Sequence, residues 1–237
     1  MRRMSLLVVA LALGVAGTAV AAHRSAAHRS APRGVDSSNF VRYVTNPYYP
    51  LKPGTVLVYK GIKDGQSQTD RVTVTRQTKR IEGVRTTVIR DVSTHGGTVL
   101  ESTWDFYAQD KQGNVWYFGE NTRAYHNGHV STEGSWRAGV NGARPGIIME
   151  GAPHVSNGYR QEYYRNHAED QAWVVGIGAT LHVPYGRVHP ILRSFEWTRL
   201  EPSVIDEKDY GRGIGIVREV SRTGALETAY LVHVHRP

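Results

Sequence analysis

The stretch TVLESTWDFYAQDKQGNVWYF, residues 98–118, decides the fold. The apolar residues Leu100, Trp104 and Phe106 are separated within it by even numbers of positions, four and two. A period of two places alternate side chains on one face of a β-strand. The segment KQGN at residues 111–114 combines polar residues with a glycine, which is typical of a turn. The stretch therefore predicts two strands joined as an antiparallel hairpin, with Leu100, Trp104 and Phe106 facing the core.

Segments of the same kind run outward from this hairpin in both directions. Each is rich in β-branched or aromatic residues and is bounded by glycine, proline, asparagine or aspartate. They lie at residues 55–60, 70–78, 84–92, 159–165, 172–181, 187–200, 203–210, 214–221 and 225–235. We therefore predict an all-β protein, an antiparallel meander of about ten to twelve strands that curls into a barrel, half-barrel or sandwich.

The beginning of the chain has the pattern of a secretory signal peptide. A basic start precedes an apolar run, which ends at the small-residue site Ala19-Val20-Ala21. The run is too short to predict a membrane-spanning helix. We predict a secreted or periplasmic protein with a signal peptide at 1–21, a disordered basic leader at 22–39 and a single β domain at 40–237.

Composition excludes several classes of protein. The chain has no cysteine, so it forms no disulfide and carries no lipidated N-terminal cysteine. Its formal charge is +8, but five of its 29 Lys and Arg residues precede Ser37. There is no dense basic stripe and no nucleic-acid-binding motif, so we predict no nucleic-acid partner. The hydrolase elbow, the zinc-protease helix and the phosphate-binding loop are also missing, and no catalytic residue is predicted.

Two histidines are the candidate metal ligands. A two-residue turn at residues 185–186 would place His182 opposite His189, and opposed residues have Cβ atoms about 5 Å apart. Such a pair could supply two of the three or four ligands of a zinc or copper site. No third ligand can be named, and exposed histidines at a hairpin tip give the same pattern. The leading expectation is therefore that the protein has no cofactor.

The segment from Gly134 to Gly158 interrupts the alternation with several glycines and prolines. A connection of this length is typically a lid or binding loop, or else irregular wall structure. We predict that it forms a flap over an opening and that the ligand site lies in or just after it. The predicted ligand-binding residues are Trp136 and Met149 as apolar contacts, with Tyr159, Glu162 and Tyr164 following them.

Several stretches resemble a group of secreted bacterial and archaeal β-rich proteins that has no assigned activity. They are NPYYPLKPGT at 46–55, DKQGNVWYFGE at 110–120, GSW at 134–136 with PGIIM at 145–149, YRQEY at 159–163 and YGRGIGIVRE at 210–219. The resemblance covers about residues 46–232. It implies an exported antiparallel β domain similar to calycin-like and lipoprotein-type carriers, and it implies no catalytic residue.

Three functions fit these observations. The first is a secreted or periplasmic, non-catalytic binding protein for a small apolar or amphipathic molecule. The second is an envelope-associated structural or adhesive protein, with a cell-envelope polymer as partner. The third is a metal-dependent enzyme that uses the paired histidines. Both ends of the predicted sheet contain strong β formers, so a homodimer through a sheet edge is a further expectation.

Overall fold

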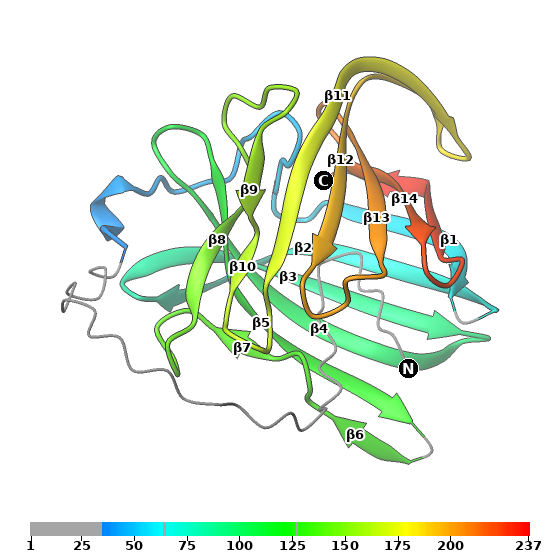
Figure 1. Ribbon diagram of the computed structural model, residues 1–237, viewed down its shortest axis with the longest axis horizontal. Coiled ribbons are helices and arrows are strands. Elements are labelled where there is room, and N and C mark those ends of the chain that lie inside the picture. The colour runs from blue at the N-terminus through cyan, green and yellow to red at the C-terminus, as the bar shows by residue number, and fades with distance from the viewer. Residues whose placement is uncertain (1–34, 64, 127) are drawn as a thin grey trace, which may run out of the picture.

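A computed structural model describes residues 35–63, 65–126 and 128–237, which form one antiparallel sheet (Figure 1). Its strands are β1 (Val56–Lys63), β2 (Gln66–Ile81), β3 (Val84–His95), β4 (Thr98–Gln109), β5 (Val115–His126), β6 (His129–Ser131), β7 (Trp136–Arg137), β8 (Arg144–Met149), β9 (Gly158–Arg160), β10 (Glu162–Tyr163), β11 (Asp170–Val183), β12 (Gly186–Thr198), β13 (Ile205–Gly211), β14 (Gly215–Thr223) and β15 (Thr228–His235). The predicted signal peptide and residues 22–34 of the predicted leader lie outside the described residues. Within residues 35–39, Ser37–Asn39 form a 3-10 helix, η1, whose N-cap is Asp36.

The sheet curls into a nearly closed barrel. Its order is β10-β8-β5-β4-β3-β2-β1-β15-β14-β13-β12-β11-β9, so the first strand pairs with the last. The two ends of this order, β9 and β10, are separated along the chain by Gln161 alone. The segment 158–163 thus pairs with β11 through its first half and with β8 through its second half. This change of partner at Gln161 brings the ends of the sheet together.

The predicted all-β antiparallel meander is confirmed. Eleven of the described strands have six or more residues, and β6, β7, β9 and β10 have two or three. The opening stretch forms the β4–β5 hairpin, in which Tyr107 pairs with Tyr117. In the β5–β6 hairpin His126 lies opposite His129.

Both faces of β4 are buried along its second half: Phe106 belongs to the hydrophobic core and Trp104 packs against it, as expected, but the polar face is buried as well. Thr103, Asp105 and Tyr107 are at most 1% exposed. On the opposite face, the guanidinium of Arg90 covers Trp104 at 5.2 Å, and the ammonium of Lys79 covers Phe106 at 4.6 Å. Trp104 and Phe106 are therefore covered on the outside of the barrel by long basic side chains. The apolar stems of these lysine and arginine side chains make this contact possible. Polar residues and tyrosine line the inside.

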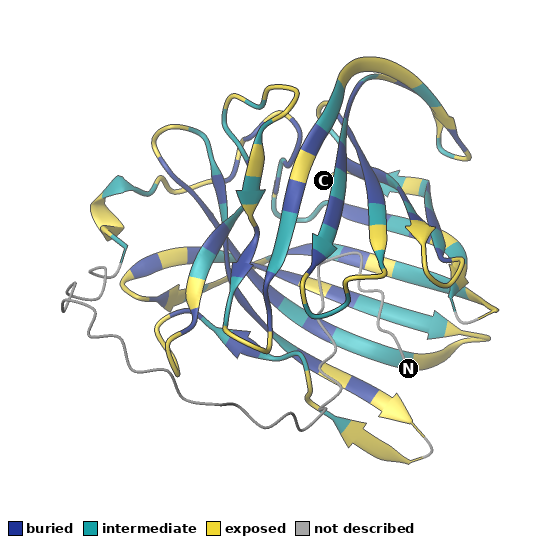
Figure 2. Cartoon of the chain, viewed as in Figure 1, coloured by how far each residue is buried: buried dark blue, intermediate teal, exposed yellow. Residues whose placement is uncertain are grey.

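The segment from Gly134 to Gly158 is part of the barrel wall and not a flap. Its strands β7 and β8 both pair with β5. Gly119 makes the first pairing possible, because a Cβ at this position would lie 2.3 Å from the Trp136 carbonyl oxygen. Ile148 and Met149 are buried, as the dark segment of β8 shows (Figure 2).

The β11–β12 hairpin turns one residue earlier than predicted. Val183 pairs with Gly186 and His182 with Arg187, so Pro184 and Tyr185 form the turn. Proline has no N–H to donate to a strand ladder and suits a turn position. The predicted placement of His182 opposite His189 is therefore wrong.

The strands on which an edge-to-edge dimer was expected are not free edges. β1 and β15 pair with each other over most of their length, from Val56 with His235 to Ile62 with Thr228. The strands that end the sheet order, β9 and β10, are only three and two residues long. None of the helices in the described part of the chain is long and apolar enough to cross a membrane.

Candidate functional site

Three of the five predicted ligand-binding residues lie inside the barrel. Trp136, Met149 and Glu162 are buried, with 4%, 0% and 0% of their surface exposed. Trp136 donates a hydrogen bond from Nε1 to Glu162 Oε1 at 3.3 Å. Tyr159 is half-buried, and burial raises the pKa of its hydroxyl above the ordinary value. Met149 lies opposite Val115 on β5 and belongs to the apolar core.

Tyr164 is half-buried and packs against the core from the turn that follows β10. Its ring stacks on His167 at 4.3 Å, within a turn in which Tyr164 forms a bridge with Ala168. Strict alternation along an uninterrupted strand at 159–165 would put Arg160, Glu162 and Tyr164 on one face. The change of partner at Gln161 breaks that alternation, so Glu162 points inward while Arg160 is exposed.

Aromatic rings form a continuous row through the interior. Tyr107 and Tyr117 stack at 4.7 Å, and Tyr117 meets the edge of Trp136 at 5.4 Å. Tyr49 contacts Tyr107 at 5.4 Å and Tyr210 at 6.4 Å. The row connects β13 with β7 across the barrel, because its members come from strands on different sides of the sheet.

Acidic side chains surround this row. We call six of them the interior carboxyl cluster: Asp91 on β3, Asp105 on β4, Glu120 on β5, Glu162 on β10, Asp170 on β11 and Glu219 on β14. Neighbouring members interact electrostatically although their strands lie around most of the barrel. Carboxyl groups from strands so widely separated approach one another only if all of them point inward. The cluster is therefore the polar lining of the barrel.

Few donors serve these carboxyl groups. Tyr117 donates to Asp105 Oδ1 at 2.7 Å, and Thr122 donates to Glu120 Oε2 at 3.1 Å. Among the described residues, the buried oxygens Asp91 Oδ1, Asp105 Oδ2 and Glu162 Oε2 have no hydrogen-bond partner. Both side-chain amide atoms of Gln161, which is fully buried at the change of partner, also lack one there. A buried polar group without a partner costs free energy, so this arrangement needs an explanation.

Burial shifts the protonation of the cluster. It raises the pKa of Asp105 and Glu219 to about 8 and that of Asp170 to about 7. The pKa values of Asp91, Glu120 and Glu162 are also raised, first by burial and then by neighbouring carboxylates. Desolvation disfavours the charged form of an acid, and like charges disfavour it further. Part of the cluster therefore holds protons near neutral pH.

Lys208 on β13 is the one fully buried ammonium group among the described residues. Its Nζ lies 2.9 Å from Glu196 Oε2 and 3.8 Å from Glu219 Oε1. Although desolvation lowers it, these carboxylates raise the pKa of Lys208 above the ordinary value. Tyr210 and Ser194 both donate to Glu196 Oε1 at 2.8 Å. Among the described residues, Lys208 forms ion pairs with Glu196 and Glu219 alone, so the other carboxyl groups of the cluster stay neutral by holding protons and would ionise more readily beside a further cation.

An apolar cavity adjoins the cluster. It is lined by Tyr49, Pro50, Leu51, Leu57, Tyr59, Val72, Val74, Ile89 and Ile214 to Ile216. Ile89 faces this cavity, and Asp91, two residues further along the same face of β3, belongs to the cluster. The cavity volume is about 30 Å³, which accommodates a single water molecule rather than a larger ligand.

The predicted metal ligands are far from forming a complete site. His189 Nδ1 lies 3.2 Å from the hydroxyl of Thr180, while His182 pairs with Arg187. Across residues 35–63, 65–126 and 128–237, no group of three or more His, Cys, Asp or Glu residues has the arrangement that could hold a metal ion.

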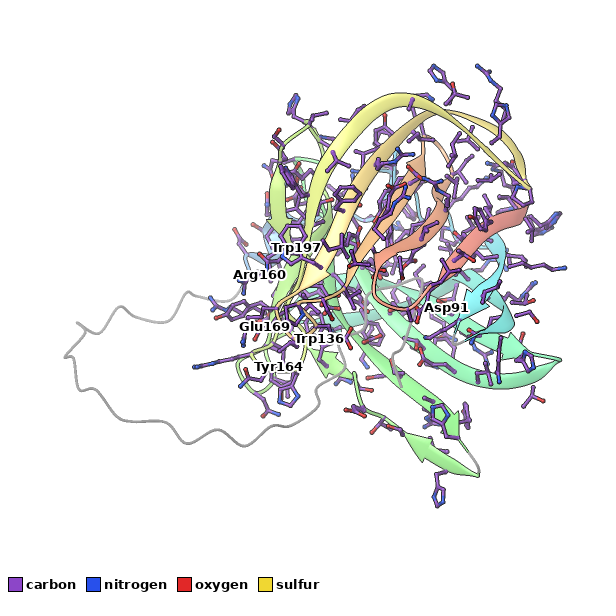
Figure 3. The ribbon with its side chains drawn as sticks, turned by 45° about the vertical axis from the view of Figure 1, so that its right-hand side comes forward. Asp91, Trp136, Arg160, Tyr164, Glu169 and Trp197 are labelled. Atoms are coloured by element: carbon purple, nitrogen blue, oxygen red, sulfur yellow. The ribbon has the colours of Figure 1, made fainter. Side chains whose placement is uncertain are left out.

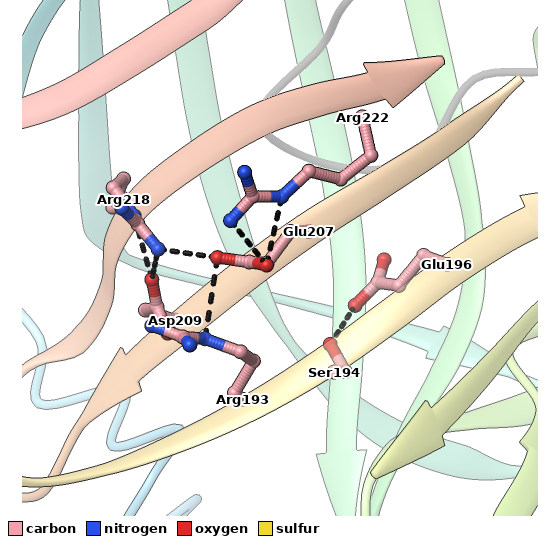
Figure 4. A network of polar contacts seen from close by, with 7 residues as sticks. All are labelled: Arg193, Ser194, Glu196, Glu207, Asp209, Arg218 and Arg222. Carbon is pink, nitrogen blue, oxygen red and sulfur yellow. Dashed lines mark hydrogen bonds and ion pairs between the residues drawn. The ribbon is translucent and has the colours of Figure 1, made fainter. Parts of the chain in front are cut away.

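A second set of buried carboxylates faces the outside of the barrel (Figure 4). Glu207 and Asp209 on β13 are at most 2% exposed. Arg193 donates to Asp209 Oδ1 at 2.8 Å, and Arg218 donates to Asp209 Oδ2 at 2.7 Å and also binds Glu207. Arg222 donates to Glu207 Oε2 at 2.6 Å. These pairs join β12, β13 and β14, which gives this set of carboxylates a structural role.

Sequence reasoning missed Asp91, Asp105 and Glu120 as site residues. A signal was present, because Glu101, Thr103 and Asp105 alternate with the apolar residues of the opening stretch. On an antiparallel sheet with one solvated face, such a row of polar residues predicts the face that is exposed to solvent. Only the closure of the sheet makes this face the interior.

No family model and no curated protein matches this chain. Two solved structures are similar to it. One is an inferred exported protein with a YmcC-like fold from Bacteroides fragilis, 13% identical, with a TM-score of 0.48 and coverage of 80% of this chain and 99% of that chain. The other is an inferred lipoprotein from Parabacteroides distasonis, 13% identical, with a TM-score of 0.36 and the same coverage. The assignment of the fold rests on the strand pairing of this chain.

Proposed function

We propose that this protein is a secreted or periplasmic, non-catalytic binding protein whose barrel interior holds an amphipathic ligand with a protonated amine. The observation that carries the proposal is the set of buried, unpartnered oxygens of Asp91, Asp105 and Glu162. An ammonium group has three N–H donors and no acceptor. It would supply both the missing donors and a further cation.

The apolar half of such a ligand has a matching surface. Ligand sites are typically apolar with a few polar groups that fix orientation. Leu57, Val72 and Ile89 line the apolar cavity beside the cluster. Because this cavity is small, an alkyl chain would have to displace the segment 49–51, which lines it. The backbone N–H groups of Tyr49 and Leu51 donate to the carbonyl oxygens of Asn46 and Val44. Of the apolar and amphipathic ligands expected from the sequence, the acidic lining favours the amphipathic kind.

Trp136 and Glu162 would act together in this site. The indole N–H fixes one oxygen of Glu162 and leaves Oε2 for the ligand. A charged partner strengthens a hydrogen bond to a carboxylate, particularly where water is excluded. Glu162 is therefore the residue on which we expect amine binding to depend most.

The test is a calorimetric titration of the mature protein with octylamine, octanol and octanoate, which share an eight-carbon chain and differ in charge. We expect octylamine to bind most tightly, and Glu162→Gln to weaken it tenfold or more. Glutamine keeps the size of the side chain and the acceptor for Trp136. Glu133→Gln is the matched control, because it removes the same charge from an exposed position. Equal affinity for octanoate, or an unchanged affinity in Glu162→Gln, would refute the proposal.

A further inference from the structure

Three residues on the outside of the wall form a compact group, which we call the Arg–Tyr surface: Arg144 on β8, Arg160 on β9 and Tyr163 on β10. The guanidinium carbon of Arg144 lies 4.2 Å from the centroid of the Tyr163 ring, and that of Arg160 lies 4.7 Å from it. Both arginines are exposed, while the ring is half-buried. One tyrosine thus holds two guanidinium groups close together at the place where the sheet closes.

The charges of this surface are not neutralised by the described residues around it. Glu169 is the acid beside it, and both oxygens of Glu169 already accept hydrogen bonds from Arg199. In the described part of the chain, neither Arg144 nor Arg160 forms an ion pair with a carboxylate group. Figure 3 shows Arg160, Tyr164 and Glu169 together on one side of the barrel. Arg160 interacts electrostatically with Glu169, but this single carboxylate also serves Arg199. The surface therefore keeps a net positive charge, which favours an external anion.

A second stack borders the same surface. Tyr164 and His167 lie parallel at 4.3 Å, with an angle of 17° between their planes. Tyr164 follows Tyr163 directly, and Arg165 beside it is exposed. Aromatic side chains with a polar tip offer an apolar face together with a hydrogen-bonding group. The surface thus combines guanidinium forks with a flat apolar element.

We propose that the Arg–Tyr surface binds an acidic polysaccharide. The carboxylates of uronic acid residues would accept paired hydrogen bonds from Arg144 and Arg160, a geometry that the planar guanidinium group matches. The apolar face of a sugar ring would lie on the Tyr164–His167 stack. This site is separate from the barrel interior, which selects positive charge, so it stands whether or not the interior binds an amine.

The observations favour a polysaccharide over nucleic acid. Nucleic acids require a basic stripe that follows many phosphates, and their affinity then depends mainly on charge count. Here the basic residues are few and are oriented by one aromatic ring. We therefore expect the polysaccharide to bind at this surface alone. Its affinity should depend on where the arginines lie as well as on the total charge of the protein.

The experiment measures binding of the full protein to polygalacturonate, a defined uronic acid polymer, with amylose as the neutral counterpart. We expect the double variant Arg144→Gln, Arg160→Gln to lower the affinity for polygalacturonate at least tenfold. The matched control is Arg71→Gln, Arg76→Gln, because these exposed arginines on β2 carry the same charge. The control should change the affinity less than twofold, and melting temperatures verify that both variants fold.

A third variant separates position from charge. Tyr163→Leu keeps both arginines but removes the ring that holds them, and we expect it to weaken polygalacturonate binding threefold to tenfold. Equal losses in the two double variants would overturn the proposal, because they would show dependence on net charge alone. Binding of polyphosphate or double-stranded DNA as tight as that of polygalacturonate would overturn it as well.

Discussion

Asp105 places a carboxyl group inside the barrel, beside the hydroxyl of Tyr117 and near Glu101, Glu120 and Glu162. Burial raises its pKa to about 8 from the ordinary 3.8. Between these two values the folded protein keeps a proton that the unfolded chain releases. The free energy of unfolding therefore falls as the pH rises through this window.

This linkage predicts the effect of Asp105→Asn. The amide keeps the acceptor for Tyr117 but cannot ionise. We expect the free energy of unfolding of the variant to gain about 4 kcal/mol on that of the wild type between pH 5 and pH 8.5, because over most of this range the folded wild-type protein holds a proton that its unfolded chain has released. Urea unfolding at both pH values measures the difference. A difference that is the same at the two pH values would contradict the assigned pKa.

At the scale of elements, the outer ion pairs join three strands through residues of unequal burial. The side chain of Arg218 is 17% exposed and contacts both Glu207 and Asp209, whereas that of Arg222 is 46% exposed and contacts Glu207 alone. Breaking a buried pair leaves an uncompensated charge, but an exposed pair contributes little. We expect Arg218→Gln to lower the free energy of unfolding by about 3 kcal/mol and Arg222→Gln by less than about 1 kcal/mol. Equal losses in urea unfolding would show that the network does not depend on burial.

The closure of the sheet depends on another element contact. A Cβ at Gly146 on β8 would lie 2.4 Å from the carbonyl group of Gln161, so β10 approaches β8 only because this residue is glycine. We expect Gly146→Ala to separate these strands and to speed hydrogen exchange at residues 158–163 at least tenfold. Gly176→Ala is the control, because a Cβ there would meet nothing closer than 4.0 Å. Unchanged hydrogen exchange in Gly146→Ala would mean that β8 and β10 can pair at a wider separation than the one observed.

The same elements show how far the sequence predicts the structure. Alternation and turn residues predict the strands and the β4–β5 and β5–β6 hairpins, because these signals are local. Phe106 and Trp104 of β4 belong to the core or pack against it, as predicted, but the burial of Thr103 and Asp105 on the other face was missed, since no local pattern reveals a closed interior. His182 and His189 were misplaced by the position of Pro184 in the turn. The change of partner at Gln161 likewise depends on two strands distant in sequence.

At the scale of the whole molecule, charge is divided between inside and outside. The chain carries a formal charge of +8, yet the barrel interior gathers carboxyl groups around one fully buried lysine among the described residues. The other Lys and Arg residues in the described part of the chain are exposed or half-buried, and Arg144 and Arg160 present their charges beside Tyr163. This division of charge fits a protein that binds an anionic polymer on its surface and a cationic ligand in its interior.

The central claim is that the interior selects an amphipathic cation. The most direct measurement is native mass spectrometry of the mature protein incubated with an equimolar mixture of octylamine, octanol and octanoate. We expect one adduct with the mass of octylamine, which is retained in Glu133→Gln and lost in Glu162→Gln. An adduct of octanoate or octanol of equal abundance, or an octylamine adduct that persists in Glu162→Gln, would contradict it.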